Sequence, residues 1–151
     1  MNLISEITNQ LKEQKIDYRI LYSSRIKLYS ENEKLIEQIS EAWKNEFIGN
    51  SKVPYVDQYL WHVFSYKIKE SIEGDQALDE YQKQYVSKIY IFNQLKSYLI
   101  ECKNQMPKIE LQNYADDIYI CHHNMKWTLV LPHEMPEMGP YFTNKIIKNQ
   151  K

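Results

Sequence analysis

The spacing of apolar residues along the chain changes several times between the helical period and the strand period. Apolar positions near the N-terminus follow a helical stripe, predicting a short amphipathic helix there: Leu3, Ile4, Ile7 and Leu11. Residues 16–22 alternate with a period of two, and residues 25–28 do so again after Ser23-Ser24. This alternation predicts two short strands in succession.

Residues 30–33 (S-E-N-E) have the form of a helix capping box, in which Ser30 and Glu33 would each bond the other's backbone amide. A helical apolar stripe follows directly: Leu35, Ile36, Ile39, Trp43 and Phe47. Gly49 suits a left-handed helix end. We therefore predict a helix from about Ser30 to Gly49, with Trp43 and Leu35 facing the core.

An aromatic run follows at residues 55–66 (YVDQYLWHVFSY). We predict a central strand over residues 59–66, with Trp61 and Val63 on one face and His62 on the other. Residues 56–60 fit a helical turn equally well. His62 is expected to be a core histidine, which requires partners for its ring nitrogens.

Helical spacing returns after Gly74, with Asp75 as the expected N-cap and an inner stripe of Ala77, Leu78, Tyr81 and Tyr85. Residues 88–92 fit either a strand or the first turn of a further helix. Leu95, Leu99 and Cys102 are spaced as in a helix that ends at Met106-Pro107.

Residues 115–131 alternate on either side of a polar connection at residues 122–125, which predicts a β-hairpin with Trp127 inside. Pro132 ends the second strand because proline cannot continue an interior ladder. The predicted fold is a single α+β domain over residues 1–151. It has a small, mostly antiparallel sheet with a C-terminal hairpin, packed by three or four helices.

Composition excludes several classes of protein. The chain has 151 residues, 43% of them hydrophobic, and a net charge of −1, so it shows no basic excess for binding nucleic acid. No apolar run approaches the roughly eighteen residues of a membrane span, and the N-terminus does not resemble a signal peptide. We expect a cytoplasmic protein, with Cys102 and Cys121 reduced and half-buried.

The motifs of common catalytic and metal sites do not occur. With three glycines the chain has no phosphate-binding loop, and His133-Glu134 is not followed by a second histidine at metal-ligand spacing. His122-His123 and His133 are separated by a strand about 20 Å long, and Cys121 points away from His122. Asp116-Asp117 reads as a solvated strand entrance. We predict no metal and no cofactor.

Aromatic residues are abundant, with thirteen tyrosines, three tryptophans and four phenylalanines. Tyrosine and tryptophan are enriched where proteins bind proteins, since they bury a large area at low entropic cost. Tyrosine can also replace leucine or phenylalanine in a core. Both interpretations stay open at this point.

Several motifs in this order resemble a bacterial family known as domain of unknown function 4275, found largely in Bacillus-type organisms. They are W-H-V-F-S-Y at residues 61–66, D-D-I-Y-I at 116–120, W-T-L-V at 127–130, His133-Glu134 and G-P-Y-F at 139–142. The resemblance covers about residues 30–145. Pro132 stands where the family is expected to have threonine. Because the family has no assigned activity, the resemblance implies class and compartment but no reaction.

These observations favour a module that binds one protein partner, such as an immunity-type or regulatory protein, over an enzyme. The candidate binding residues are Trp61, His62, Tyr66, His133, Glu134, Tyr141 and Phe142. The alternative is a small hydrolase or nuclease that uses His62, His133 and Glu134 for acid–base chemistry. We expect Glu134 to bond one of these histidines, as a pin that holds the loop rather than as part of a catalytic base.

Overall fold

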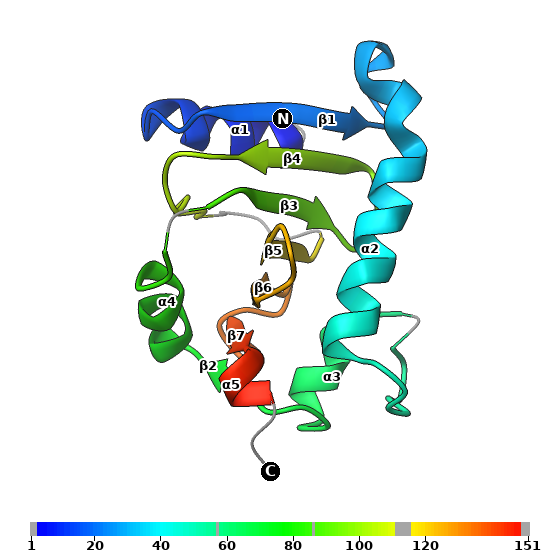
Figure 1. The fold of residues 1–151 in the computed structure, drawn as a ribbon, viewed down its shortest axis with the longest axis vertical. Helices are drawn as coiled ribbons and strands as arrows, with labels where there is room; N and C mark the ends of the chain where they lie inside the picture. The colour runs from blue at the N-terminus through cyan, green and yellow to red at the C-terminus, as the bar shows by residue number, and fades with distance from the viewer. Residues whose placement is uncertain (1–2, 57, 86, 111–115, 149–151) are drawn as a thin grey trace.

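The chain forms one antiparallel sheet with helices on both faces (Figure 1). This computed structural model describes residues 3–56, 58–85, 87–110 and 116–148. The sheet order is β1-β4-β3-β5-β6-β7-β2. The strands are β1 (Tyr18–Ser23), β2 (Ile72–Glu73), β3 (Ile89–Asn93), β4 (Tyr98–Cys102), β5 (Ile118–His122), β6 (Trp127–Leu131) and β7 (Tyr141–Asn144). The helices are α1 (Leu3–Glu13), the 3₁₀ helix η1 (Lys27–Asn32), α2 (Glu33–Phe47), α3 (His62–Ser65), α4 (Asp75–Gln82) and α5 (Lys145–Lys148).

The central strands are covered on both faces. Every residue of β4, β5 and β6 is buried, so each of these strands contributes side chains to two separate cores. Figure 1 shows α2 and α4 on opposite sides of the sheet. The predicted α+β class with an antiparallel sheet is confirmed. Within the described residues, no helix is long and apolar enough to cross a membrane.

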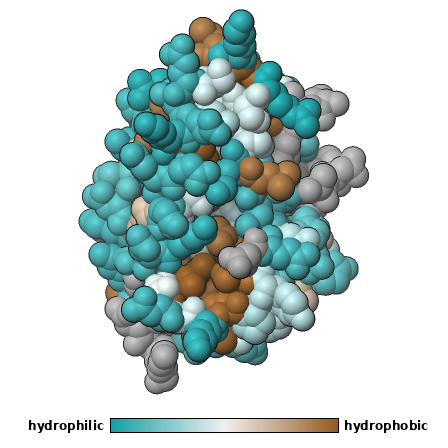
Figure 2. Space-filling view, turned by 90° about the vertical axis from the view of Figure 1, so that its right-hand side faces the viewer, coloured by the Kyte–Doolittle hydropathy of each residue, from teal (hydrophilic) through white to brown (hydrophobic). Residues whose placement is uncertain are grey.

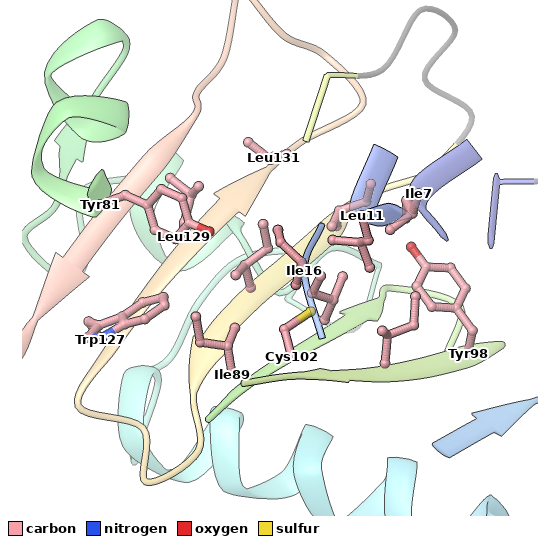
Figure 3. Close-up of a cluster of buried hydrophobic side chains, with 14 of the residues drawn as sticks. Ile7, Leu11, Ile16, Tyr81, Ile89, Tyr98, Cys102, Trp127, Leu129 and Leu131 are labelled. Carbon is pink, nitrogen blue, oxygen red and sulfur yellow. The ribbon is translucent and has the colours of Figure 1, made fainter. Parts of the chain in front are cut away.

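Alternation along the strands divides the apolar side chains between these cores. Ile118 and Ile120 of β5 join the core under α1 and α4, while Tyr119 and Cys121 join the core under α2 and α3. Figure 3 shows the first core, with Ile7 and Leu11 of α1 and Tyr81 of α4 directed at the sheet. These packed faces supply most of the apolar burial that stabilises the fold.

Trp43 is the centre of the second core. Its ring lies 5.2 Å from Phe47, 6.0 Å from Phe64 and 5.1 Å from Tyr119, measured between centroids. Its Nε1 donates to Thr128 Oγ1 at 2.9 Å, so the indole also has a polar partner. The prediction that Trp43 and Leu35 face the core is confirmed, with Trp43 fully buried and Leu35 half-buried against the same core.

The predicted hairpin is also confirmed. β5 and β6 pair in the register Ile118↔Leu131 to Cys121↔Thr128, and Trp127 is buried. Met125 takes a positive φ of 58° in the connection. Pro132 follows the last residue of β6, as expected. Ala115 lies outside the described residues.

The N-terminal predictions need two corrections. Residues 25–28 are not a strand, because a 3₁₀ helix begins at Lys27. Ser30 does not form a capping box, since its Oγ donates to the Lys27 carbonyl and α2 begins at Glu33 without a side-chain cap. Gly49 does have the left-handed conformation that was predicted, with a φ of 61°.

Residues 59–66 are not a strand but turns around the short helix α3. Phe64 and Ser65 both donate their backbone amides to the Trp61 carbonyl. The buried positions Leu60, Val63 and Phe64 follow a helical spacing, which the apolar composition of the run concealed. The alternative of a helical turn at its beginning was closer to the structure.

The helix predicted over Leu95 to Cys102 is also wrong, because residues 98–102 form β4 between β1 and β3. Residues 88–92, which were left open, belong to strand β3 from Ile89 onward. On α4, Ala77 and Tyr81 face the core, but Leu78 is exposed and Tyr85 lies beyond the helix in solvent. Gly74, not Asp75, is the N-cap residue.

Truncating Trp43 tests the second core. Trp43→Ala should lower the free energy of unfolding by about 3–5 kcal/mol, because it leaves a cavity and removes the partner of Thr128. Chemical denaturation measures this change, with Leu28→Ala on the exposed surface of η1 as the control. A loss below about 1 kcal/mol would contradict the described packing.

Candidate functional site

The hairpin brings Asp117 and His133 together, one just before β5 and the other just after β6. Asp117 Oδ1 accepts the backbone N–H of His133 at 2.7 Å and lies 2.8 Å from His133 Nδ1. The Asp117 side chain is 2% exposed, and that of His133 is 27% exposed. A buried carboxylate thus orients a partly exposed imidazole.

This contact determines how the His133 ring is presented. The Asp117 carboxylate accepts the proton on Nδ1, which leaves Nε2 as the nitrogen directed away from Asp117. Glu134 Oε1 is 3.9 Å from Nε2, beyond hydrogen-bonding distance. His133 therefore has an anchoring carboxylate, but Asp117 fills the place in which Glu134 was expected.

The interpretation of Asp117 as a solvated residue was wrong, since it is buried and bonded. The register of the β5–β6 hairpin could have identified Asp117 as the partner of His133. Because Ile118 pairs with Leu131, Asp117 falls opposite Pro132 and beside His133. The alternating pattern predicted the hairpin, but the register was not extended past the ends of the strands.

His62 lies in the same region, brought there by α3. The Tyr59 ring is between the two histidines, with its centroid 5.5 Å from that of His62 and 4.9 Å from that of His133. The pKa of His62 is lowered from 6.5, chiefly by burial. The negative charges of Glu134 and Asp117 oppose this shift, and His133 adds to it. The two histidine motifs therefore meet in space. His62 Nδ1 lies 2.9 Å from Ser65 Oγ.

The C-terminal end of the loop from Pro132 to Pro140 is held by two hydrogen bonds to Glu73 and Gly74. Gly139 donates its backbone N–H to Glu73 Oε2 at 3.2 Å, and Gly74 donates to the Pro140 carbonyl at 2.9 Å. Gly139 has a φ of 83°, and a Cβ at this position would lie 2.7 Å from Pro132 Cδ. Only glycine allows this close approach, which closes the loop that carries His133.

A set of neighbouring rings forms the surface around His62. We call it the aromatic–histidine surface and define it as Tyr55, Tyr59, His62, Tyr66 and His133. Tyr55 and Tyr66 contact the His62 ring at centroid distances of 6.4 and 5.0 Å. Tyr55 is 68% exposed and Tyr66 is 45% exposed, so the surface offers apolar area to solvent. Tyr55 and Tyr59 were not among the predicted site residues.

Two of the remaining predicted residues, Trp61 and Tyr141, lie below this surface. Trp61 is fully buried, 4.5 Å from His62 between ring centroids, and Tyr141 is stacked beneath it at 6.3 Å. Burial, followed by Glu73 and Glu134, raises the pKa of Tyr141 to about 12. Phe142 belongs to the core on the other face of the sheet. The structure thus places Trp61 and Tyr141 as support and separates Phe142 from the site.

Other candidate chemistry is less well supported. Cys102 and Cys121 are fully buried rather than half-buried, and burial raises the pKa of both thiols, that of Cys102 to about 12. Neither thiol is therefore a thiolate nucleophile near neutral pH. Within the described residues, no group of three or more His, Cys, Asp or Glu side chains is arranged to hold a metal ion.

His122 and His123 lie at the turn end of the hairpin, away from His133. Their rings stack at 4.3 Å, and His123 Nδ1 lies 3.0 Å from the Lys88 carbonyl oxygen. The strand β6 separates this pair from His133, so the three histidines do not form one site.

The fold and site together define an α+β protein in which a buried carboxylate orients a histidine within an aromatic surface. The chain belongs to the family described as domain of unknown function (DUF4275), whose family model matches residues 5–142. No curated protein and no solved structure matches the chain.

The contacts of His133 predict a specific order of effects on stability. Asp117→Asn and His133→Gln should each lower the free energy of unfolding by about 1–3 kcal/mol, since each disturbs the hydrogen bonds of the buried Asp117 carboxylate. Glu134→Gln should change it by less than about 0.5 kcal/mol, because Glu134 is exposed and 3.9 Å away. Denaturant unfolding measures all three. An effect of Glu134→Gln as large as that of His133→Gln would contradict this assignment.

His122 predicts a dependence of stability on pH. Its Nδ1 accepts the Asn124 backbone N–H at 2.9 Å, which requires the neutral ring. Burial, then His123, Lys126 and Lys145, lower its pKa from 6.5 to about 4. The unfolded state therefore binds the proton first as pH falls, so this contribution to stability is complete above pH 6.5 and is lost towards pH 4.

The comparison of wild type with His122→Asn isolates this contribution, because the asparagine Oδ1 can still accept a hydrogen bond. Urea unfolding at several pH values between 4 and 7 should give a smaller loss of stability for the variant. Parallel curves for the two proteins over this range would show that His122 does not titrate as described.

Proposed function

We propose that this chain is a bacterial cytoplasmic protein that binds one protein partner through the aromatic–histidine surface. The observation that carries the proposal is the contact of Tyr55 and Tyr66 with His62 while both tyrosines remain exposed. Tyrosines of this kind bury a large area on binding and keep a hydroxyl for hydrogen bonds.

The support beneath this surface favours tight binding. Trp61 contacts the His62 and Tyr59 rings, at centroid distances of 4.5 and 5.6 Å, and is itself buried. Asp117 fixes the orientation of His133 from below. Side chains that are already ordered lose less conformational entropy when a partner binds. This preorganisation separates the surface from Tyr85, an exposed tyrosine elsewhere on the chain.

The wider surface is consistent with a local binding site. Figure 2 shows a mostly hydrophilic α2 side, with its largest apolar area in the lower half and smaller ones above it. The tyrosines and histidines of the aromatic–histidine surface are not coloured as apolar there, because both residue types lie on the hydrophilic side of the hydropathy scale. An apolar area rimmed by polar residues is typical of interaction sites. The two free buried cysteines fit the reducing environment of a cytoplasm.

A second candidate function is acid–base catalysis by a small hydrolase or nuclease. The observation that favours it is the Asp117–His133 contact of 2.8 Å, since an aspartate that holds Nδ1 leaves Nε2 to accept a proton from water. His62 lies close enough to take part, and burial lowers its pKa, which favours the neutral form that acts as a base. We place this second because the hydroxyl beside His62, that of Ser65, donates to the His62 carbonyl at 3.4 Å and so is bonded within its own helical turn.

Partner capture from the native cell tests the first proposal. Immobilised wild-type protein should retain a specific protein, identified by mass spectrometry, that Tyr55→Ala and Tyr66→Ala lose. For a purified partner, each change should weaken binding by about 2 kcal/mol, roughly thirtyfold, as expected for a central tyrosine. Isothermal titration calorimetry measures this loss.

Tyr85→Ala is the matched control, because Tyr85 is 94% exposed and follows α4 on the other face of the sheet. It should bind the partner as wild type does. Equal retention by the Tyr55, Tyr66 and Tyr85 variants would contradict the proposed surface. Turnover of an ester or phosphodiester that His133→Gln abolishes and Tyr66→Ala preserves would favour the enzyme instead.

A further inference from the structure

A second site lies on the opposite face of the sheet, between α4 and residues 107–110. A cavity of about 230 Å³ opens there, which we call the α4 cavity. Its floor is Ile120 of β5 with Leu129 and Leu131 of β6, and its walls include Leu78 and Tyr81. Figure 3 shows Tyr81 reaching from α4 towards Leu129, with Leu131 further along β6.

Hydrogen bonds hold the far wall of the α4 cavity in place. Tyr81 donates its hydroxyl to the Pro107 carbonyl at 2.6 Å, which sets the distance between α4 and this segment. Gln14, in the turn just after α1, bonds both backbone groups of Lys108, at 2.6 and 2.8 Å. Gln10 bonds both backbone groups of Glu110 in the same way, at 2.5 and 2.7 Å.

These paired bonds act on alternate residues, 108 and 110, as the bonds of a neighbouring strand do. They satisfy the backbone at positions 108 and 110 and leave the Ile109 side chain to pack on the apolar core. The wall therefore cannot collapse onto the sheet without breaking hydrogen bonds. The cavity is a preformed feature, which is typical of ligand sites.

The size and lining of the α4 cavity define the body of a ligand. An apolar cavity of about 150 Å³ accommodates benzene. At about 230 Å³ the α4 cavity has room for one ring and a short tail, and Tyr81 provides an aromatic wall beside it.

The polar rim defines the other end of the ligand. It consists of Asp79, Gln82, Lys108 and Glu110, and so carries two carboxylates against one ammonium group. A ligand with an anionic head would meet a net negative rim, whereas an ammonium head could pair with Asp79 or Glu110. We propose that the α4 cavity binds a small aromatic amine, with its ring over Leu129 and its ammonium group at the rim.

Phenethylamine and phenylacetate are matched probes, since they have similar rings and tails but opposite charges. NMR titration of the isotope-labelled full chain should give saturable shifts of the Leu78, Ile109 and Leu131 methyl groups with phenethylamine. Phenylacetate should bind about fivefold more weakly, the difference that one screened surface ion pair provides. The absence of shifts at these methyl groups with phenethylamine would overturn the proposal.

Two changes test the location and the charge separately. Leu78→Trp places a large ring at the mouth and should abolish the shifts, while Leu28→Trp on exposed η1 should leave them unchanged. Asp79→Asn together with Glu110→Gln keeps the apolar lining and should remove the preference for the amine. Shifts that persist in Leu78→Trp, or a preference that survives the double change, would overturn the proposal.

Discussion

The structure depends on a sheet that must be covered on both faces. Because β4, β5 and β6 have no exposed residue, neither face can be left to solvent, and each requires its own layer of helices. α1 and α4 cover one face, and α2 with α3 cover the other. The strands alternate their side chains between the two layers, so a slip of one residue would exchange the cores. Trp43 secures the second layer because it combines a large apolar surface with a hydrogen bond to Thr128.

The same constraint explains the position of the candidate site. Polar groups at the ends of buried strands must find partners, since an unsatisfied buried carboxylate is strongly unfavourable. Asp117 meets this requirement by accepting two hydrogen bonds from His133, one from the backbone and one from the ring. A requirement of folding thereby orients an imidazole at the surface. The ring of Tyr59 then joins His133 to His62, which comes from a different part of the chain.

The two faces differ in what they offer to other molecules. The α2 and α3 side carries exposed rings that lie on a rigid buried layer, an arrangement suited to a broad protein contact. The α4 side carries an apolar cavity that opens between charged rim residues, which suits a small molecule. The sheet separates them, so a change on one face leaves the contacts of the other in place. Gln10 of α1 and Gln14 in the turn after it hold the segment beside the α4 cavity through hydrogen bonds, although neither residue lines the cavity.

The sequence by itself determined the α+β class, the family, the hairpin of β5 and β6, and the inward face of α2 around Trp43. In the hairpin and in α2, the apolar residues recur with a clear strand or helical period, and the residues that end or turn each element lie close by in the sequence. Only the tertiary structure decided that residues 59–66 are helical turns and that residues 98–102 form a strand. Most residues in those runs are apolar, so a helical and a strand period fit the pattern equally well. β4 also depends on its partners β1 and β3, which local spacing does not reveal. The role of Asp117 was also decided there, because a carboxylate next to a strand becomes buried only when the loop after β6 closes over it.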